Sequence, residues 1–206
     1  SFVIIIFLGN KKDYQLLCRI KDKIYNRVFF DRVPVKDRLG GLAMRRAVCP
    51  GSFDPVTKGH IDIFERASAM FDELIISVFH NPGKDKAMFS MEERVEMLKE
   101  ATKHIPNVKV TCFSGLLNEF CKKEEAPFIV RGLRAFTDFE YEFQRALLLK
   151  KIDNDLETVF IMTNAKYSFV SSSGVRELAT FGGQLKDLVP ECIEERIRKH
   201  VYQKFE

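Results

Sequence analysis

The chain has 206 residues, of which 46% are hydrophobic and 30% are charged. This composition excludes a wholly disordered chain, and the length suits one α/β domain with or without an appendage. The formal charge of +4 would by itself suggest a nucleic acid or a membrane surface as partner. However, residues 1–43 carry nine Lys or Arg against four Asp or Glu, a net +5, whereas residues 44–206 carry 24 against 25, a net −1. The basic excess therefore lies wholly in the first fifth of the chain.

Residues 1–43 give weak structural signals. The apolar run at 2–8 is far shorter than the roughly 20 residues that a membrane span needs, and it lacks the basic start and cleavage site of a signal peptide. We therefore expect a cytoplasmic protein that contacts neither membrane nor nucleic acid. We predict that 1–43 is an N-terminal extension, non-native or poorly ordered, that Met44 is the natural start, and that 44–206 forms the functional domain. The alternative for 1–43 is a basic RNA-binding arm.

From Met44 onward the pattern predicts strands alternating with helices. Apolar residues at helical spacing follow the turn Pro50-Gly51, and Ser90 with Glu93 forms a capping box that predicts a helix start. Five strands alternating with helices indicate an α/β fold, with a doubly wound five-stranded parallel sheet and helices on both faces. The predicted strands are 46–49, 73–79, 108–113, 127–130 and 157–162, and the later helices are 116–123, 138–152, 172–181 and a last one from Pro190 to about Lys204.

The five cysteines follow no disulfide or zinc pattern. Their number is odd, they are widely spaced, and no Cys-x-x-Cys occurs. We expect them to be small buried side chains in a reducing compartment, and we expect no protein-bound metal site.

The first motif that carries chemistry lies between the first predicted strand and helix. Gly51 permits close approach of the backbone to a ligand, Ser52 and Phe53 follow it, and Gly59-His60 places an imidazole at a helix N-terminus, where anions are favoured. The spacing is not that of a Walker loop. The alternative is structural, with glycine and proline as turn formers and the histidine as a helix cap.

A second motif opens a late helix. Val170 leads into Ser171, Ser172 and Ser173, whose hydroxyls lie next to the free N–H groups of a first helical turn, with Arg176 one turn further on. This arrangement suits a phosphate. A plain serine N-cap is the alternative.

A third group is basic and follows two strands. Arg131-Gly132-Leu133-Arg134 stands at the end of a predicted strand, where two guanidinium groups could grip phosphates in bidentate fashion, and Lys84 follows another strand. Solvated surface side chains are the alternative for each. Because all these motifs fall at the carboxyl ends of strands, they jointly predict a site for several phosphates, as adenylyl transfer requires.

These motifs resemble those of the nucleotidylyltransferase superfamily, and the similarity is greatest to bacterial phosphopantetheine adenylyltransferases. It rests on CPGSFDP at 49–55, GHIDI at 59–63, FSMEER at 89–94, RGLRA at 131–135, DFEYE at 138–142 and YSFVSSS at 167–173, in family order. The resemblance implies a Rossmann-like fold and the reaction of ATP with 4′-phosphopantetheine to give dephospho-coenzyme A and pyrophosphate. It also implies Mg²⁺ bound mainly through the ATP phosphates, a homohexamer, and feedback inhibition by coenzyme A.

The resemblance also implies roles for individual residues. His60, Ser52, Lys84 and Arg134 would be catalytic, with His60 on the α-phosphate, and Ser52, Lys84, Leu117 and Arg131 would bind the acceptor. ATP would be bound by Ser52, Phe53, His60, Gly132, Leu133, Arg134, Glu142, Tyr167, Ser168, Phe169, Val170, Ser171, Ser172 and Ser173.

Two functional alternatives stay open at this point. The loop carrying Lys84 is one residue longer than in some members, so Lys86 could take its place. Another small nucleotidylyltransferase, acting on nicotinamide mononucleotide or a cytidylyl donor, is the nearest alternative reaction, and a non-catalytic nucleotide- or RNA-binding module is an alternative of a different class.

Overall fold

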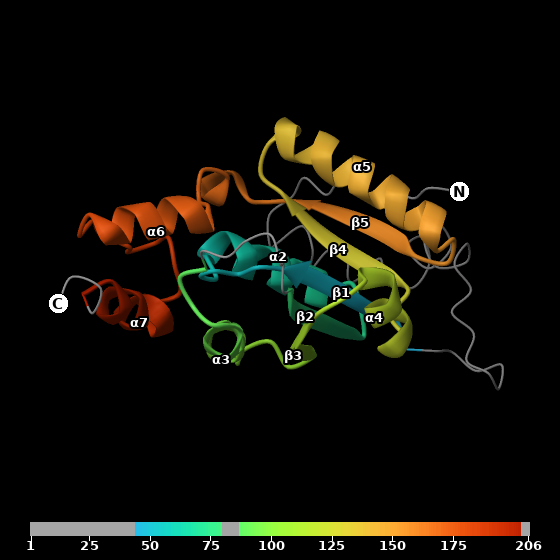
Figure 1. Ribbon diagram of the computed structural model, residues 1–206, viewed down its shortest axis with the longest axis horizontal. Helices are drawn as coiled ribbons and strands as arrows, with labels where there is room; N and C mark the ends of the chain where they lie inside the picture. The colour runs from blue at the N-terminus through green and yellow to red at the C-terminus, as the bar shows by residue number, and fades with distance from the viewer. Residues whose placement is uncertain (1–43, 80–86, 203–206) are drawn as a thin grey trace.

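The computed structural model describes residues 44–79 and 87–202. The predictions made for residues 1–43, Lys84 and Lys86 lie outside these residues. Within them, five strands form one sheet: β1 (Arg46–Gly51), β2 (Glu73–Phe79), β3 (Val108–Phe113), β4 (Phe128–Leu133) and β5 (Glu157–Met162). All neighbouring strands run parallel, in the order β3-β2-β1-β4-β5, which confirms the predicted α/β class (Figure 1).

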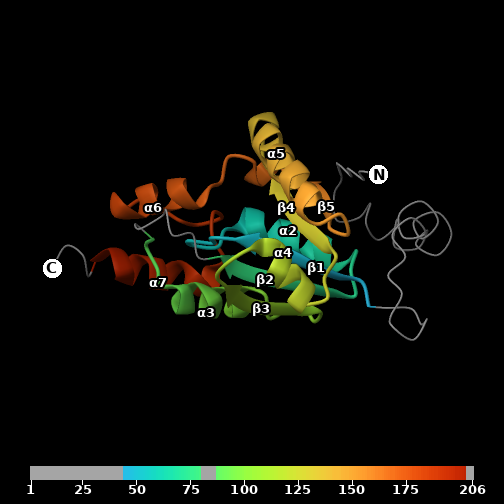
Figure 2. The same cartoon turned by 45° about the vertical axis from the view of Figure 1, so that its right-hand side comes forward.

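Helices cover both faces of this sheet. They are α2 (Lys58–Ser68), α3 (Met91–Ala101), α4 (Leu117–Lys123), α5 (Phe136–Ile152), α6 (Ser172–Thr180) and α7 (Glu191–Tyr202), with a 3₁₀ turn η2 (Ala165–Tyr167). Successive strand residues enter different cores: Ala47 and Cys49 pack with α2, α3 and α7, whereas Val48 packs with α4. This alternation along β1 shows that the sheet is buried on both sides, as a doubly wound fold requires. Figure 2 shows α5 over β4 and β5, and α6 and α7 together beyond one end of the sheet.

Several helices begin where the sequence places a capping residue. The Ser90 hydroxyl accepts the N–H of Glu93 at 3.1 Å, and the Glu93 carboxylate accepts the N–H of Ser90 at 2.7 Å. The predicted capping box of α3 is therefore confirmed. At α2 a similar box forms between Thr57 and His60, and at α6 the Ser171 hydroxyl accepts the N–H of Gly174. Each cap satisfies N–H groups that the first helical turn leaves unpaired.

Two strands extend further than the sequence predicts. β1 continues through Gly51, and β4 continues through Leu133 rather than ending at Val130. In β4 the added residues stay in the ladder because Arg131 pairs with Phe160 and Gly132 with Ile161 of β5. The Arg-Gly pair is therefore part of the strand end itself.

The sheet opens between β1 and β4. β1 pairs with β2 over six residues, but with β4 only at Ala47↔Phe128 and Val48↔Ile129. The chain reverses its winding direction here, since β2 and β3 lie on one side of β1 and β4 and β5 on the other. Such a switch point leaves a crevice beyond the carboxyl ends of the strands, where α/β folds bind ligands.

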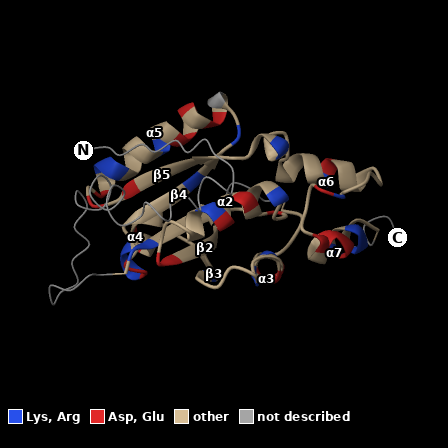
Figure 3. Ribbon diagram, turned by 180° about the vertical axis from the view of Figure 1, so that it is seen from behind, with Lys and Arg blue, Asp and Glu red and all other residues tan. Residues whose placement is uncertain are grey.

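Charge is mixed over the described surface. Figure 3 shows Lys and Arg interspersed with Asp and Glu over the helices rather than gathered on one face. Over residues 44–79 and 87–202, none of the helices combines the length and apolar character that a membrane crossing demands.

Candidate active site

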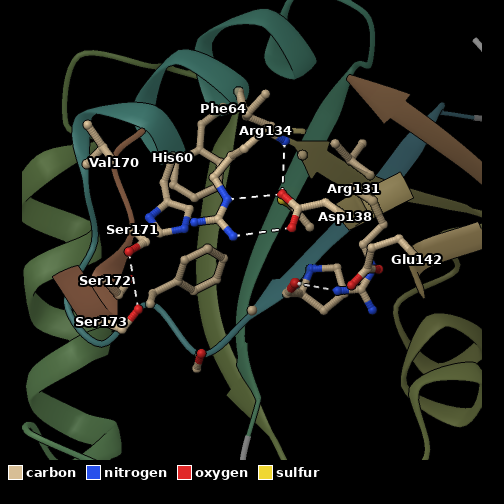
Figure 4. Close-up of a pocket in the computed structure, with 18 of the residues that line it drawn as sticks. His60, Phe64, Arg131, Arg134, Asp138, Glu142, Val170, Ser171, Ser172 and Ser173 are labelled. Atoms are coloured by element: carbon tan, nitrogen blue, oxygen red, sulfur yellow. Dashed lines mark hydrogen bonds and ion pairs between the residues drawn. The ribbon is translucent and has the colours of Figure 1, made fainter. Parts of the chain in front are cut away.

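A cleft of about 580 Å³ lies at the opening between β1 and β4. The end of β1, the start of α2, the end of β4, the first turns of α5 and the N-terminus of α6 all line it, as Figure 4 shows in part. The structure thus brings residues of all three motifs together at one sheet edge, whereas Lys84 of the third group lies outside the described residues. The predicted site residues that line the cleft are Ser52, Phe53, His60, Arg131, Gly132, Arg134, Glu142, Val170, Ser171, Ser172 and Ser173.

Other predicted site residues do not line this cleft. Leu133 is fully buried in the core with Ala146 and Phe160, so only its backbone is available to a ligand. Leu117, the first residue of α4, packs against the core cluster that contains Phe120 and Cys121. Tyr167, Ser168 and Phe169 follow β5 outside the cleft, and the Phe169 side chain is 75% exposed.

His60 is held by the residue that caps its helix. The backbone N–H of Thr57 donates to Nδ1 of His60 at 3.0 Å, and the Thr57 hydroxyl lies 3.1 Å from the same nitrogen. Burial, and secondarily the charge of Arg134, lower the pKa of His60 from 6.5 to about 4. The ring is therefore neutral at pH 7. Because Nδ1 accepts a hydrogen bond, the ring proton is on Nε2.

The loop that follows β1 folds back so that the Phe53 ring lies against Gly51. A Cβ atom at Gly51 would lie 2.6 Å from the ring of Phe53, so this position accepts only glycine without movement. Phe53 is 5% exposed, has a positive φ of 45°, and meets the His60 ring edge-on at a centroid distance of 5.2 Å. A bulky residue in this conformation is strained, and such strain is concentrated at functional sites. The loop fixes one wall of the cleft next to His60.

Arg131 bridges the gap between β1 and β4. Its guanidinium donates to the carbonyl of Pro50 at 3.1 Å and forms an ion pair with Glu142 of α5 at 3.2 Å. Burial lowers the pKa of Arg131, while the Glu142 charge opposes that effect. Glu142 was predicted to face ATP; in this structure its carboxylate reaches the cleft and is paired with Arg131.

Arg134 is oriented by a residue that we did not predict. Its backbone N–H and Nε donate to one carboxylate oxygen of Asp138 at 3.1 Å, and a second guanidinium nitrogen lies 3.3 Å from the other oxygen. Figure 4 shows this bidentate pair beside the His60 ring. The i, i+4 spacing of Arg134 and Asp138 at the start of a helix was the available sequence signal.

The serine motif lies on the opposite wall. Ser171 caps α6, Ser173 lies 3.2 Å from the Ser171 hydroxyl, and Ser172 donates to the carbonyl of Pro55 at 2.8 Å. Arg176 also donates to the carbonyl of Asp54 and forms an ion pair with its carboxylate at 3.3 Å. Ser171 is thus the N-cap of α6, and the motif as a whole joins α6 to the loop after β1.

The arginines and serines that line the cleft can bind anions, and its cysteine is unsuited to covalent attack on a substrate. Cys49 lines it, but burial raises the pKa of its thiol to about 12, so it is not a thiolate nucleophile. Cys49 and Cys121 are buried as expected, whereas Cys112 and Cys192 are exposed. In the described parts of the chain, no three His, Cys, Asp or Glu residues gather as a metal site, and both carboxylates of the cleft are paired with arginines.

Comparisons with known proteins identify the family to which the chain belongs. The Cytidylyltransferase-like family matches residues 48–178. A phosphopantetheine adenylyltransferase of Clostridium botulinum (strain 657 / Type Ba4) is 55% identical over 163 residues, which cover 79% of this chain and 99% of the relative. One from Caldanaerobacter subterraneus subsp. tengcongensis is 54% identical over 154 residues, 75% of this chain and 96% of the relative.

Structural similarity extends to more distant proteins. A solved structure from Vibrio parahaemolyticus, assigned as a nicotinate-nucleotide adenylyltransferase, aligns with a TM-score of 0.56 at 18% identity, covering 75% of this chain and 99% of that one. At this identity the similarity supports the fold alone.

Proposed function

The chain belongs to the phosphopantetheine adenylyltransferase family, and we propose that its cleft transfers the adenylyl group of ATP to 4′-phosphopantetheine. The products are dephospho-coenzyme A and pyrophosphate. The observation that carries this proposal is the convergence of His60, Arg131, Arg134 and the Ser171–Ser173 motif on one crevice, in a chain that covers nearly all of its adenylyltransferase relatives.

The two substrates divide the cleft between them. The acceptor phosphate is proposed to lie near Ser52 and Arg131, with Leu117 further along the same sheet edge and Lys84 contributed from outside the described residues. ATP is proposed to bind along Gly132 and Arg134 and across to the 167–173 stretch. Leu133 contributes only its backbone to this surface, because its side chain is buried.

The chemistry is positioning and electrostatic stabilisation. An oxygen of the acceptor phosphate forms a bond to the α-phosphorus, while the bond from that phosphorus to the bridging oxygen breaks and its electron pair leaves with pyrophosphate. Two anions must approach each other, so the guanidinium groups of Arg131 and Arg134 offset their repulsion. His60, which is neutral, donates from Nε2 to a phosphoryl oxygen as charge develops on it. No covalent intermediate is required, consistent with the protonated Cys49 thiol.

Mg²⁺ is part of the proposal as a component of the substrate MgATP. The cleft carboxylates of Asp138 and Glu142 are each engaged with an arginine, so the donor set of the protein does not form a magnesium cage. Held through ATP phosphates, the ion neutralises charge on the triphosphate.

Self-association and feedback inhibition complete the proposal. Helix α5 exposes Leu148 (61%) and Ile152 (53%), which lie one turn apart on the same helix face, and this supports burial of the face in a homohexamer. Coenzyme A contains both a pantetheine and an adenylate part, so it is expected to occupy both halves of the cleft as an inhibitor. A cytoplasmic location is consistent with the unpaired thiols among the described residues.

Pyrophosphate release tests this function directly. The full chain is incubated with MgATP alone, with MgATP and phosphopantetheine, and with MgATP and either nicotinamide or nicotinate mononucleotide. We expect release only with phosphopantetheine; release with a mononucleotide instead would assign a different acceptor. Light scattering of the same preparation reports the oligomeric state, and a monomer would contradict the hexamer.

A further inference from the structure

A buried ion pair on α2 holds the chain segment that follows β5. Asp62 and Arg66 are one helical turn apart, 3.1 Å from carboxylate to guanidinium, with side chains only 15% and 7% exposed. The same Asp62 oxygen accepts the backbone N–H of Asn164 at 3.1 Å, and Arg66 donates to the backbone carbonyl of Met162. The pair therefore contacts both ends of the connecting segment 162–164, which runs from the last residue of β5 to the residue before η2.

This connecting segment leads directly to the proposed adenine side of the cleft. Asn164 caps η2 by accepting the N–H of Lys166 at 3.2 Å, and η2 ends at Tyr167. The start of α2 packs against the same stretch, since a Cβ at Gly59 would lie 3.5 Å from Cβ of Tyr167 and 3.6 Å from Thr163. His60 is the next residue after this contact. The distance between His60 and Tyr167 is thus set within one short stretch of packed backbone.

Neither member of the pair lines the cleft. Stability alone is a weak reason for the pair, because a desolvated ion pair contributes little net stability compared with apolar residues of the same size. The pair instead supplies two directional hydrogen bonds to the connecting segment. The Asp62 carboxylate accepts one backbone N–H, and the Arg66 guanidinium donates to one backbone carbonyl.

We propose that Asp62 and Arg66 are positioning residues that fix the nucleotide-base side of the cleft relative to His60, and so determine affinity for ATP and preference for adenine. This inference rests on the proposed function, which assigns the 167–173 stretch to ATP. Without the contacts of the pair, the connecting segment 162–164 is less restrained, and Tyr167 and the residues after it can shift away from α2. The acceptor side of the cleft, between β1 and β4, keeps the hydrogen bond between Arg131 and Pro50.

The test compares variants that alter the contacts of Asp62 and Arg66 in different ways. Asp62→Asn keeps an acceptor for the N–H of Asn164 but removes the negative charge. Arg66→Lys keeps the positive charge but loses the planar guanidinium. The double variant Asp62→Asn with Arg66→Met removes both charges, so that neither is left unpaired. Glu194→Gln is the control, because Glu194 and Arg198 form an i, i+4 pair on α7 at 2.7 Å and neither residue lines the cleft.

Three readouts separate positioning from general loosening. We expect the pair variants to raise the KM for ATP about tenfold, as displacements of about 1 Å can change rates up to about 10²-fold, while the KM for phosphopantetheine changes less than about twofold. The ratio of kcat/KM for ATP to that for ITP is expected to fall at least about threefold. Glu194→Gln is expected to change none of these values.

Equal changes in both KM values, or an unchanged ATP to ITP ratio, would overturn the inference. If the double variant melts far below the wild type, Arg66→Lys supplies the same comparison in a chain that keeps both charges. Calorimetric binding of α,β-methylene-ATP, which requires no turnover, separates the two claims. Weaker binding in the variants supports positioning even if phosphopantetheine proves to be the wrong acceptor, and unchanged binding contradicts positioning even if the acceptor is right.

Discussion

The backbone N–H of Thr57 donates to Nδ1 of His60 at 3.0 Å, which places the proton of the ring, kept neutral mainly by burial, on Nε2. The helix N-terminus next to it attracts anions, but the histidine does not add a full positive charge to that attraction. Its proposed contribution to catalysis is a directed hydrogen bond. This distinguishes it from Arg131 and Arg134, which are proposed to supply charge.

His60→Ala is expected to lower kcat about 10²–10³-fold, or about 2.7–4 kcal/mol, as the loss of one oxyanion donor does elsewhere. His60→Gln carries an amide N–H close to the position of Nε2 and is expected to recover part of that loss. His60→Asn, whose amide stays near the position of Nδ1, is the matched control. Single-turnover rates of pyrophosphate release measure the effect; turnover of His60→Ala at the wild-type rate would contradict the assigned role.

The lowered pKa of His60 also predicts how stability depends on pH. The unfolded chain takes up the His60 proton near pH 6.5, whereas the folded protein takes it up only near pH 4. Between these values the unfolded state binds more protons, so the free energy of unfolding decreases as the pH falls. Between pH 7 and pH 5 the decrease attributable to His60 is expected to be about 1–2 kcal/mol.

Urea denaturation at the two pH values, in the wild type and in His60→Gln, measures this contribution. The variant lacks the titrating group and is expected to lose less stability on acidification. An equal loss in both proteins would show that other groups account for it.

The pairing of Arg134 with Asp138 predicts a dependence of ATP binding on a residue outside the predicted site. Asp138→Asn removes the charge that orients the guanidinium, and we expect the KM for ATP to rise a few fold, about 1 kcal/mol. Arg134→Lys cannot form the bidentate geometry and is expected to lose about tenfold in kcat/KM. Glu140→Gln, an exposed acidic residue on the same helix, is the control for charge alone. A lower KM for ATP in Asp138→Asn would instead show that the Asp138 carboxylate competes with the ATP phosphates for Arg134.

Local sequence patterns predicted the secondary structure and the fold class well. Periodicity and capping residues identified all five strands and the helices between them, and the Ser90 capping box formed as predicted. The end of β4 was missed because the Arg131-Gly132 sequence is typical of a loop, and only pairing with β5 keeps it in the sheet.

The site was predictable as a set of residues but not as a set of contacts. Arg131 and Glu142 are eleven residues apart and Asp54 and Arg176 are 122 apart, so only the tertiary fold brings each pair together. The charge state of His60 depends on burial and on Arg134, which no local pattern records.

Gly51→Ala is expected to disturb the cleft through Phe53. The added methyl group would lie 2.6 Å from the Phe53 ring, which is buried and in contact with His60, so the ring must move. We expect a loss of about 1–3 kcal/mol in stability from overpacking, together with a lower kcat. Introducing Gly51→Ala into a Phe53→Leu background tests the cause, because the smaller side chain removes the clash. A stability loss of the same size in both backgrounds would contradict it.

Residues 44–206 are predicted to fold and to catalyse the reaction without residues 1–43. Among the described residues, the five strands, the three core clusters and the lining of the cleft all come from 44–202, so we expect truncation to retain their packing. The melting temperature and the kcat for pyrophosphate release are therefore expected to match those of the full chain. Salt-dependent binding of RNA by both forms tests the alternative role of the basic segment, since counterion release would make such binding weaken steeply with salt. Unfolding or inactivity of the truncated chain would refute the domain boundary, and RNA binding lost on truncation would assign the +5 segment to that role.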